Sequence, residues 1–151
     1  MNEIDFSLER IDFALRRRFL WFFYGYDEDT LWGIIDYKNK TFGTKLRMED
    51  EMNRFIRNAS QLNQKISSIP ELGKQYQIGH TFFAEIVEIY KSYKEIGGYK
   101  SLQYQLFRHH GATDILWNIS LEPMLVSFLG NMDLEVQNEI LKDLKNIYNQ
   151  K

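Results

Sequence analysis

The sequence predicts a mostly α-helical domain preceded by one short strand and one short helix. Apolar residues recur at three- and four-residue steps through most of the chain after residue 30, which is the spacing of one face of an α-helix. Glycine and proline interrupt these periodic segments at several points, as they do between helices. A β-favouring aromatic run at residues 19–24 predicts the strand, and two helical turns ahead of it predict the short helix.

Length and composition indicate one folded domain, alone or with a short appendage. The chain has 151 residues, of which 44% are hydrophobic and 15% aromatic, so it can bury a core and is not disordered. Its net charge is −2 and its basic residues are dispersed, which argues against a surface dedicated to nucleic acid. The absence of cysteine excludes disulfides and a cysteine nucleophile, and it fits a cytoplasmic location. No apolar run reaches the roughly 18 residues of a membrane span, so we expect no membrane partner.

The first 25 residues combine a short amphipathic helix with a strand of the buried type. Residues 10–16 make about two helical turns, with Ile11 and Leu15 one turn apart on the same side. Residues 19–24, which end at Gly25, have the length and apolar content of a strand buried on both faces. In isolation such a strand would expose its edge and its rings, so we expect it to belong to a larger sheet.

Three consecutive arginines, Arg16, Arg17 and Arg18, connect this helix to the strand. A guanidinium group matches phosphate oxygens with two parallel hydrogen bonds, so the triplet is suited to a phosphoryl-transfer site. In nucleotide hydrolases an arginine of this kind, often from a neighbouring subunit, contributes about 10³ to 10⁵ in rate. The alternative is that the triplet caps the C-terminal dipole of the helix or faces solvent.

Two long helices are predicted on either side of a basic loop at residues 38–45. Acidic residues at 27–29 favour the start of the first helix. The second begins at Arg47 or Met48 and ends just before Pro70, which disfavours helical dihedrals in the residue ahead of it. The apolar residues of the first helix are Leu31, Trp32, Ile34, Ile35 and Tyr37. Those of the second helix, which we expect in the core, are Met48, Met52, Phe55, Ile56, Ala59, Leu62 and Ile66.

The second half of the chain reads as a surface loop at residues 71–78 followed by further helices. One helix begins at Gly79-His80, carries Phe83, Ile86, Val87, Tyr90 and Tyr93, and ends at Gly97-Gly98. The next is capped by Thr113 or Asp114, and Pro123 either kinks it or opens a new segment. The last is capped by Asn131 or Asp133, and its apolar stripe is Val136, Ile140, Leu141, Leu144, Ile147 and Tyr148.

Gly79 and His80 are candidate ligand-binding residues because they stand at a predicted helix N-terminus. Free backbone N–H groups and the helix dipole favour an anion there. The alternative is that His80 is a capping or partly exposed residue. His109 and His110 are adjacent, so they do not provide the i, i+4 pair of a helical zinc site, and we predict no metal site in this chain.

Residues 1–19 resemble the segment of McrB-type AAA+ proteins that runs from the MNxxDRS signature to the DYALRRRF element. These proteins are the nucleotide-hydrolysing motors of 5-methylcytosine-specific restriction systems. Phe6 stands where the family signature carries arginine, so a role of that arginine is not implied here. The residues at matching positions, without a gap, are Met1-Asn2, Asp5, Ser7-Leu8, Asp12, Ala14-Leu15 and Arg16-Arg17-Arg18-Phe19.

Two later segments extend the resemblance. Ile78–Phe83 is similar to the family's IGHSYF element, which opens the lid helix that carries the second nucleotide sensor in AAA+ proteins. The usual second sensor is an arginine, and this chain has none in that element. Residues 121–129 are similar, more faintly, to a lid segment with a proline before paired leucines.

The resemblance implies two parts: a C-terminal remnant of the AAA+ α/β nucleotide-binding core at residues 1–25 and a helical-bundle lid domain at residues 26–151. The first part would contain the first sensor and the arginine finger. The implied roles are first sensor for Asn2, contact with a neighbour's γ-phosphate for Arg17 with Arg18 beside it, nucleotide binding from the lid side for Gly79 and His80, and structural support for Asp5 and Asp12.

The resemblance also implies cofactors and partners for the full-length parent. The parent would hydrolyse GTP or ATP with Mg²⁺, assemble as a ring expected to be a hexamer, and drive an endonuclease subunit along DNA that other domains contact. This chain lacks a GxxxxGK[ST] loop and an apolar strand ending in Asp-Glu, so we expect the fragment alone to be inactive and to hold no cofactor.

Two other interpretations stay open. The chain could be a free-standing helical interaction domain whose basic triplet docks onto an acidic partner, or the lid of a MoxR-like AAA+ ATPase. A P-loop within about two hundred residues upstream, which the strand and lid order of such motors requires, would favour the motor. An in-frame stop with nothing before it would favour the interaction domain.

Overall fold

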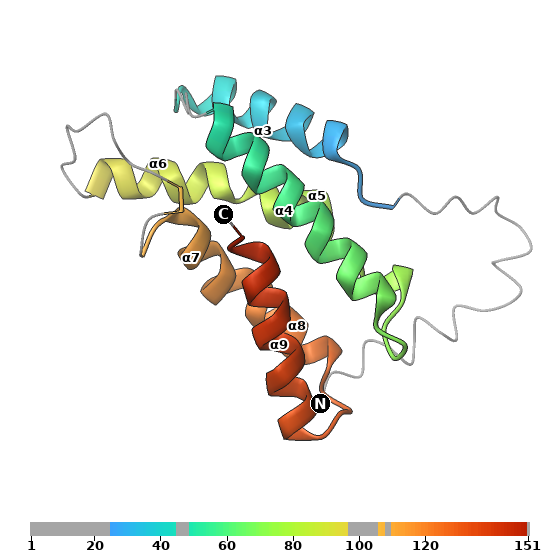
Figure 1. Cartoon of the computed structure of the whole chain (residues 1–151). Helices are drawn as coiled ribbons and strands as arrows, with labels where there is room; N and C mark the ends of the chain where they lie inside the picture. The colour runs from blue at the N-terminus through green and yellow to red at the C-terminus, as the bar shows by residue number, and fades with distance from the viewer. Residues whose placement is uncertain (1–24, 45–48, 97–105, 108–109, 151) are drawn as a thin grey trace, which may run out of the picture.

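The computed structural model describes residues 25–44, 49–96, 106–107 and 110–150, and this part of the chain is mostly helical, as predicted (Figure 1). The predicted strand and short helix within residues 1–24 lie outside the described residues, as does the stop at Gly97-Gly98. The described elements are α3 (Glu28–Phe42), α4 (Glu49–Ser68), the 3₁₀ turn η1 (Lys74–Tyr76), α5 (His80–Ala84), α6 (Ile86–Ile96), α7 (Ala112–Leu116), the π-helical turn η2 (Trp117–Leu121), α8 (Glu122–Phe128) and α9 (Leu134–Tyr148).

Helix α4 is the centre of the packing. It lies beside α9, which runs in the opposite direction, and it also contacts α3 and η1 (Figure 1). The Phe55 ring meets the Tyr148 ring of α9 and the Phe83 ring of α5 edge-on, with centroids 6.0 and 6.3 Å apart. The predicted apolar stripe is confirmed as core wherever it is described, at Met52, Phe55, Ile56, Ala59, Leu62 and Ile66.

The ends of α3 follow from its local sequence. The Asp27 carboxylate caps the start, its Oδ1 accepting from the Thr30 N–H at 2.8 Å. Gly43 ends the helix with φ 60°, a left-handed conformation that costs glycine little. The predicted loop from residue 38 was therefore wrong in its start. Lys38 stays helical, and its Nζ pairs with the Glu88 Oε1 of α6 at 2.6 Å, a contact between distant segments.

Only one side of α3 is in the core. Leu31 and Ile35, one turn apart, are 0% and 3% exposed. Trp32 and Tyr37 point elsewhere around the helix and are 42% and 71% exposed. The α-helical period of 3.6 residues explains the difference, because Trp32 is rotated by about 100° from Leu31.

The segment between α4 and α6 is more ordered and more buried than predicted. The expected surface loop at 71–78 contains η1, and its Leu72 and Ile78 are buried. The single helix expected after Gly79 is divided at Glu85 into α5 and α6. The predicted apolar face is nevertheless confirmed at Phe83, Ile86, Val87 and Tyr90, which are buried.

The helices after residue 110 are joined by a π-helical turn. Helix α7 begins one residue after Gly111, not at the predicted Thr113 or Asp114 cap, because the Thr113 hydroxyl donates instead to the Leu106 carbonyl at 2.9 Å. Pro123 lacks the N–H that would continue the α-helical ladder, and the Glu122 N–H ahead of it donates to the carbonyl of Trp117, five residues back.

The last helix begins after Asp133, one of the two caps predicted. Its stripe is buried at Leu144 and Tyr148, whereas Val136 near its start is 46% exposed. The buried Asn58 of α4 holds the end of α9, its Nδ2 donating to the Tyr148 carbonyl at 3.0 Å.

Candidate functional site

The structure describes two of the predicted site residues. Gly79 is the N-cap of α5, and His80 is its first residue, so the prediction that this pair begins a helix is confirmed. Gly79 has φ −68° and ψ 154°, an extended conformation open to any residue, so the backbone itself does not require glycine there. The other predicted residues, Asn2, Asp5, Asp12, Arg17 and Arg18, lie outside the described part of the chain.

His80 lies against the linker that enters the helical domain, and we call this contact set of Tyr26, Asp27, Gln77 and His80 the linker junction. The His80 Nε2 accepts a hydrogen bond from the backbone N–H of Asp27 at 3.0 Å. The His80 ring stacks on the Tyr26 ring, with centroids 5.1 Å apart and planes 14° from parallel. The Tyr26 N–H donates to the Gln77 Oε1 at 3.2 Å. The linker is therefore bound at two places, by Gln77 just before α5 and by His80 at the start of α5.

The phenol of Tyr26 fastens the junction to the core. Its hydroxyl donates to the Ile56 carbonyl of α4 at 3.0 Å, and its ring meets Phe83 edge-on at 5.6 Å. Burial raises the pKa of the Tyr26 phenol well above its ordinary range, and the charges of Glu28 and Asp27 raise that pKa further. Tyr26 is thus a neutral hydrogen-bond donor throughout the physiological pH range.

The hydrogen bond to His80 defines the form of its imidazole. An Nε2 atom that accepts from an N–H carries no proton, so the neutral ring has its proton on Nδ1. The Asp27 Oδ2 also lies 3.6 Å from Nε2, where it would attract a protonated ring. Hydrogen bonds from the Thr30 side chain and backbone, with the charge of His80 beside them, lower the pKa of Asp27. Nδ1–H is the group that a neutral His80 presents to a ligand.

A buried asparagine positions the residue just before Gly79 and His80. The Asn63 side chain is 1% exposed and makes two hydrogen bonds with the backbone of Ile78. Its Oδ1 accepts from the Ile78 N–H at 2.7 Å, and its Nδ2 donates to the Ile78 carbonyl at 3.0 Å. This reciprocal pair satisfies both buried peptide groups and connects the α5 start rigidly to α4.

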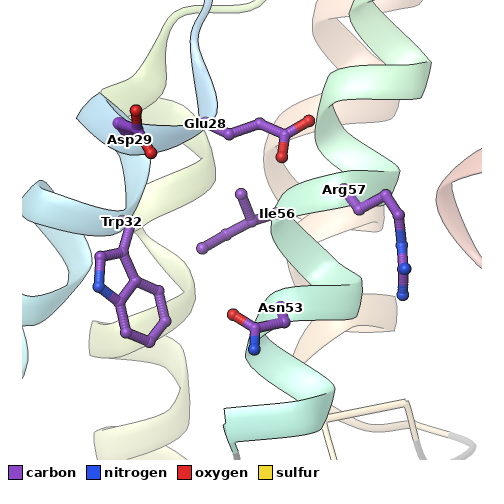
Figure 2. A pocket seen from close by; sticks show the side chains of 6 residues that line it. All are labelled: Glu28, Asp29, Trp32, Asn53, Ile56 and Arg57. Carbon is purple, nitrogen blue, oxygen red and sulfur yellow. The ribbon is translucent and has the colours of Figure 1, made fainter.

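A second feature is a pocket of about 410 Å³ between α3 and α4, which we call the α3–α4 pocket (Figure 2). Ile56 lies in its middle, the Trp32 indole forms one wall, and the Glu28 carboxylate extends across the top toward α4 (Figure 2). The residues that line it are Glu28, Asp29, Trp32, Asn53, Ile56 and Arg57. Ile56 belongs to both features, since its carbonyl accepts from Tyr26.

The α3–α4 pocket presents hydrogen-bonding groups that are not used within the described residues. The side chains of Glu28, Asp29 and Asn53 are exposed, and no partner in the described ranges binds them. In Figure 2 the Arg57 side chain points away from the Trp32 indole. An aromatic face beside two carboxylates is suited to a cationic group, which stacks on the ring and pairs with the acids. Within the part of the chain that the structure describes, no group of three histidine, aspartate or glutamate side chains could hold a metal ion.

Sequence reasoning did not find the linker junction or the α3–α4 pocket. Tyr26 and Asp27 were interpreted as linker, and Trp32 as one of the apolar residues of the helix that follows it. The sequence did contain one signal for the pocket. Glu28 and Trp32 are four residues apart at the start of α3, so the carboxylate and the indole lie on the same face of the helix. The partner of that face, Asn53 with Arg57 on α4, could not be inferred without the packing of the two helices.

Comparison of the chain with known protein families, with curated proteins and with solved structures finds no match. Among the helices that the structure describes, none combines the length and the apolar content needed to cross a membrane.

Proposed function

We propose that this chain is the helical lid, with the arginine element that precedes it, of a McrB-like AAA+ NTPase in a modified-cytosine-dependent restriction system. The ungapped match over residues 1–19 and the mostly helical domain after it support this proposal. By the same resemblance the parent uses GTP or ATP with Mg²⁺, forms a ring and drives an endonuclease subunit. Arg17, with Arg18 beside it, stabilises charge on the γ-phosphate of a neighbouring protomer, and Asn2 is the first sensor.

The observation that best supports the proposal is the hydrogen bond from the Asp27 N–H to the His80 Nε2 at 3.0 Å. The sequence resembles the motor family in two separate places, residues 1–19 and residues 78–83. The linker that leaves the first of these segments is anchored on His80 in the second. A lid that senses nucleotide needs such a rigid connection, because a change at one segment must then move the other.

The position of His80 limits how it serves as a lid-side sensor. Its Nε2 is occupied by the linker, so a neutral His80 contacts a phosphate oxygen or a base through Nδ1–H. A neutral imidazole stabilises less charge than the arginine usual at this place. His80 with Gly79 therefore contributes orientation in our proposal, and the main transition-state charge is met by Arg17.

The test is Arg17→Ala in the full-length parent. We expect turnover to fall at least about a hundredfold, with nucleotide affinity little changed, because the guanidinium acts in the transition state. Arg16→Ala is the matched control, since Arg16 is expected to cap the helix or face solvent. Unaltered turnover of Arg17→Ala in the assembled ring would remove Arg17 from the mechanism. An upstream reading frame without a P-loop would remove the motor itself and favour the interaction domain.

A further inference from the structure

We propose that the α3–α4 pocket binds a small molecule that carries a planar guanidinium group. The cation lies flat on the Trp32 indole and pairs with the carboxylates of Glu28 and Asp29. This inference goes beyond the proposed function, because the nucleotide-binding roles given above use none of the residues that line this pocket. Every residue of the site belongs to α3 or α4.

The pocket offers an accessible aromatic ring in a space large enough for a small molecule. Its volume of about 410 Å³ lies within the usual range for ligand sites, about 300 to 1,000 Å³. The Trp32 side chain is 42% exposed although its neighbour Leu31 is fully buried, so a ligand can reach the indole. A guanidinium group stacks on an indole through cation–π attraction, and tryptophan is the best of the aromatic residues for this contact.

Three polar side chains beside the indole have unused hydrogen-bonding groups. Glu28, Asp29 and Asn53 are exposed, and none of the three side chains has a partner within the described residues. Figure 2 shows the Glu28 carboxylate and the Asn53 amide above and below the level of Ile56, which lies between α3 and α4. A guanidinium group has five N–H donors in one plane, so it can pair with two carboxylates while it stacks. An ammonium group is a point charge without a flat face, so the pocket favours guanidinium.

Two positive groups oppose a cation at this place, and the carboxylates outweigh them. The N-terminus of α3 is equivalent to about half a positive charge. Against it stand Glu28, Asp29 and the capping residue Asp27, whose lowered pKa keeps it charged. The second group is Arg57, the one cation in the lining, which is exposed to water and directed away from the indole (Figure 2). The side of the pocket next to Trp32 is therefore negative.

A guanidinium group can belong to a free small molecule or to an arginine of another protein, and the lining favours the free molecule. Of the six residues that line the pocket, only Trp32 and Ile56 are apolar. Ile56 is 5% exposed, so it adds little apolar surface for a protein partner. The buried centre of a protein–protein interface is depleted of charged residues, and a stable interface needs about 800 Å² on each partner.

Titration of the 151-residue chain with n-butylguanidinium tests the proposal. The signal is the indole N–H peak of Trp32 in a proton–nitrogen correlation spectrum, identified as the peak that W32F lacks. This peak should shift and saturate, whereas the peak of the fully buried Trp117 should stay in place. n-Butylurea has the same shape without the charge. It should bind at least about tenfold more weakly, because charge-assisted hydrogen bonds are roughly twice as strong as neutral ones.

Two double variants test the carboxylates. E28Q/D29N removes both charges without touching the Asp27 cap, and it should weaken the binding of n-butylguanidinium at least about tenfold. E135Q/E139Q is the matched control, because it removes two exposed carboxylates from α9, which has the same length of 15 residues as α3. It should bind as the wild type does. Circular dichroism should show that both variants are folded.

Two single variants test the indole and the neighbouring cation. W32A should weaken binding about two- to fivefold, the change expected for an exposed cation–π contact, and the backbone N–H peaks of α3 report it. R57Q removes the one cation of the lining, so it should bind n-butylguanidinium at least as tightly as the wild type. Loss of binding in a folded R57Q variant would overturn the proposal.

Four further results would overturn it. The first is a Trp32 peak that n-butylguanidinium does not move at any concentration measured. The second is equal binding of n-butylurea, and the third is a folded E28Q/D29N variant that binds as the wild type does. The fourth is a blocked peptide, Ac-Gly-Arg-Gly-NH₂, that binds at least about tenfold tighter than n-butylguanidinium, which would assign the pocket to an arginine of a protein partner. None of these results bears on turnover by the parent, so this site and the proposed function can fail separately.

Discussion

The backbone N–H of Asp27 donates to the Nε2 of His80 across 53 positions of the sequence, at a distance of 3.0 Å. The same two residues define the starts of two helices, since Asp27 caps α3 and His80 opens α5. The bond therefore sets the position of one helix start against the other. A displacement of the linker would therefore act on α5 through the His80 imidazole and on α4 through the Tyr26 hydroxyl.

Replacing His80 should release the linker from α5 while the helical domain stays folded. His80→Ala removes the Nε2 acceptor and the stack on Tyr26 together, with an expected loss of about 1 to 2 kcal/mol in the free energy of unfolding. His80→Gln keeps an acceptor and loses the ring, and His80→Phe keeps a ring and loses the acceptor. Denaturant unfolding measures the loss, and hydrogen exchange at the Asp27 amide reports the bond directly. Unchanged exchange in His80→Ala would show that this bond does not form in solution.

The buried amide of Asn63 should contribute more to the free energy of unfolding than a surface asparagine does. Asn63→Ala leaves the N–H and the carbonyl of Ile78 without their partners, each at a cost of roughly 1 to 3 kcal/mol. Asn63→Asp keeps the acceptor but directs a carboxylate at the Ile78 carbonyl, so it should not rescue stability. Urea denaturation gives both values. Asn53→Ala, an exposed change on the same helix, should be close to neutral, and equal losses at the two positions would contradict the structure.

The charge of Asp27 should stabilise the fold at neutral pH and lose its effect in acid. Its pKa is lowered from 3.8 in the folded chain, chiefly by hydrogen bonds from Thr30, so folding favours the ionised form. That contribution is present above the unfolded value and disappears as the pH falls through the folded one. Asp27→Asn keeps a capping oxygen without the charge. The Tm difference from the wild type, followed from pH 7 to pH 2, should shrink as the pH falls below 3.8. A constant difference would assign the effect to the cap alone.

Tyr148 should make the fold sensitive to alkali. It is fully buried, and desolvation raises its pKa well above the ordinary 10.0, with the charge of Asp114 adding to the shift. A raised pKa means stability that is complete below pH 10 and is lost as the pH rises, because only the unfolded chain ionises there.

Tyr148→Phe separates this ionisation from the rest of the alkaline response. At neutral pH the variant loses the hydrogen bond to the Thr113 carbonyl, 3.3 Å long, at a cost of about 0.5 to 1.5 kcal/mol. Above pH 10 the free energy of unfolding of the wild type should fall about 1.4 kcal/mol per pH unit faster than that of the variant. Urea unfolding between pH 7 and pH 11 gives both slopes. The pKa values of Tyr26 and Tyr90 are also raised, and both tyrosines are present in the two proteins. Equal slopes for the wild type and the variant would therefore mean that the pKa of Tyr148 is not raised by folding.

The helices and their local signals were accessible from the sequence because each depends on residues a few positions apart. The α4 stripe, the acidic start of α3 and the Asp133 start of α9 are all of this kind. The errors have the opposite origin. Lys38 is helical although it was expected to begin the loop, and its ammonium pairs with Glu88, fifty positions away.

The candidate site was decided almost entirely by tertiary structure. The sequence by itself identified His80 as the start of a helix, since glycine and an apolar periodicity mark that position. It could not show that the imidazole binds the Asp27 backbone, or that Trp32 stands open beside Asn53 and Arg57. Those relations depend on which faces of α3, α4 and α5 meet. Which faces meet depends on the packing of all the core residues together.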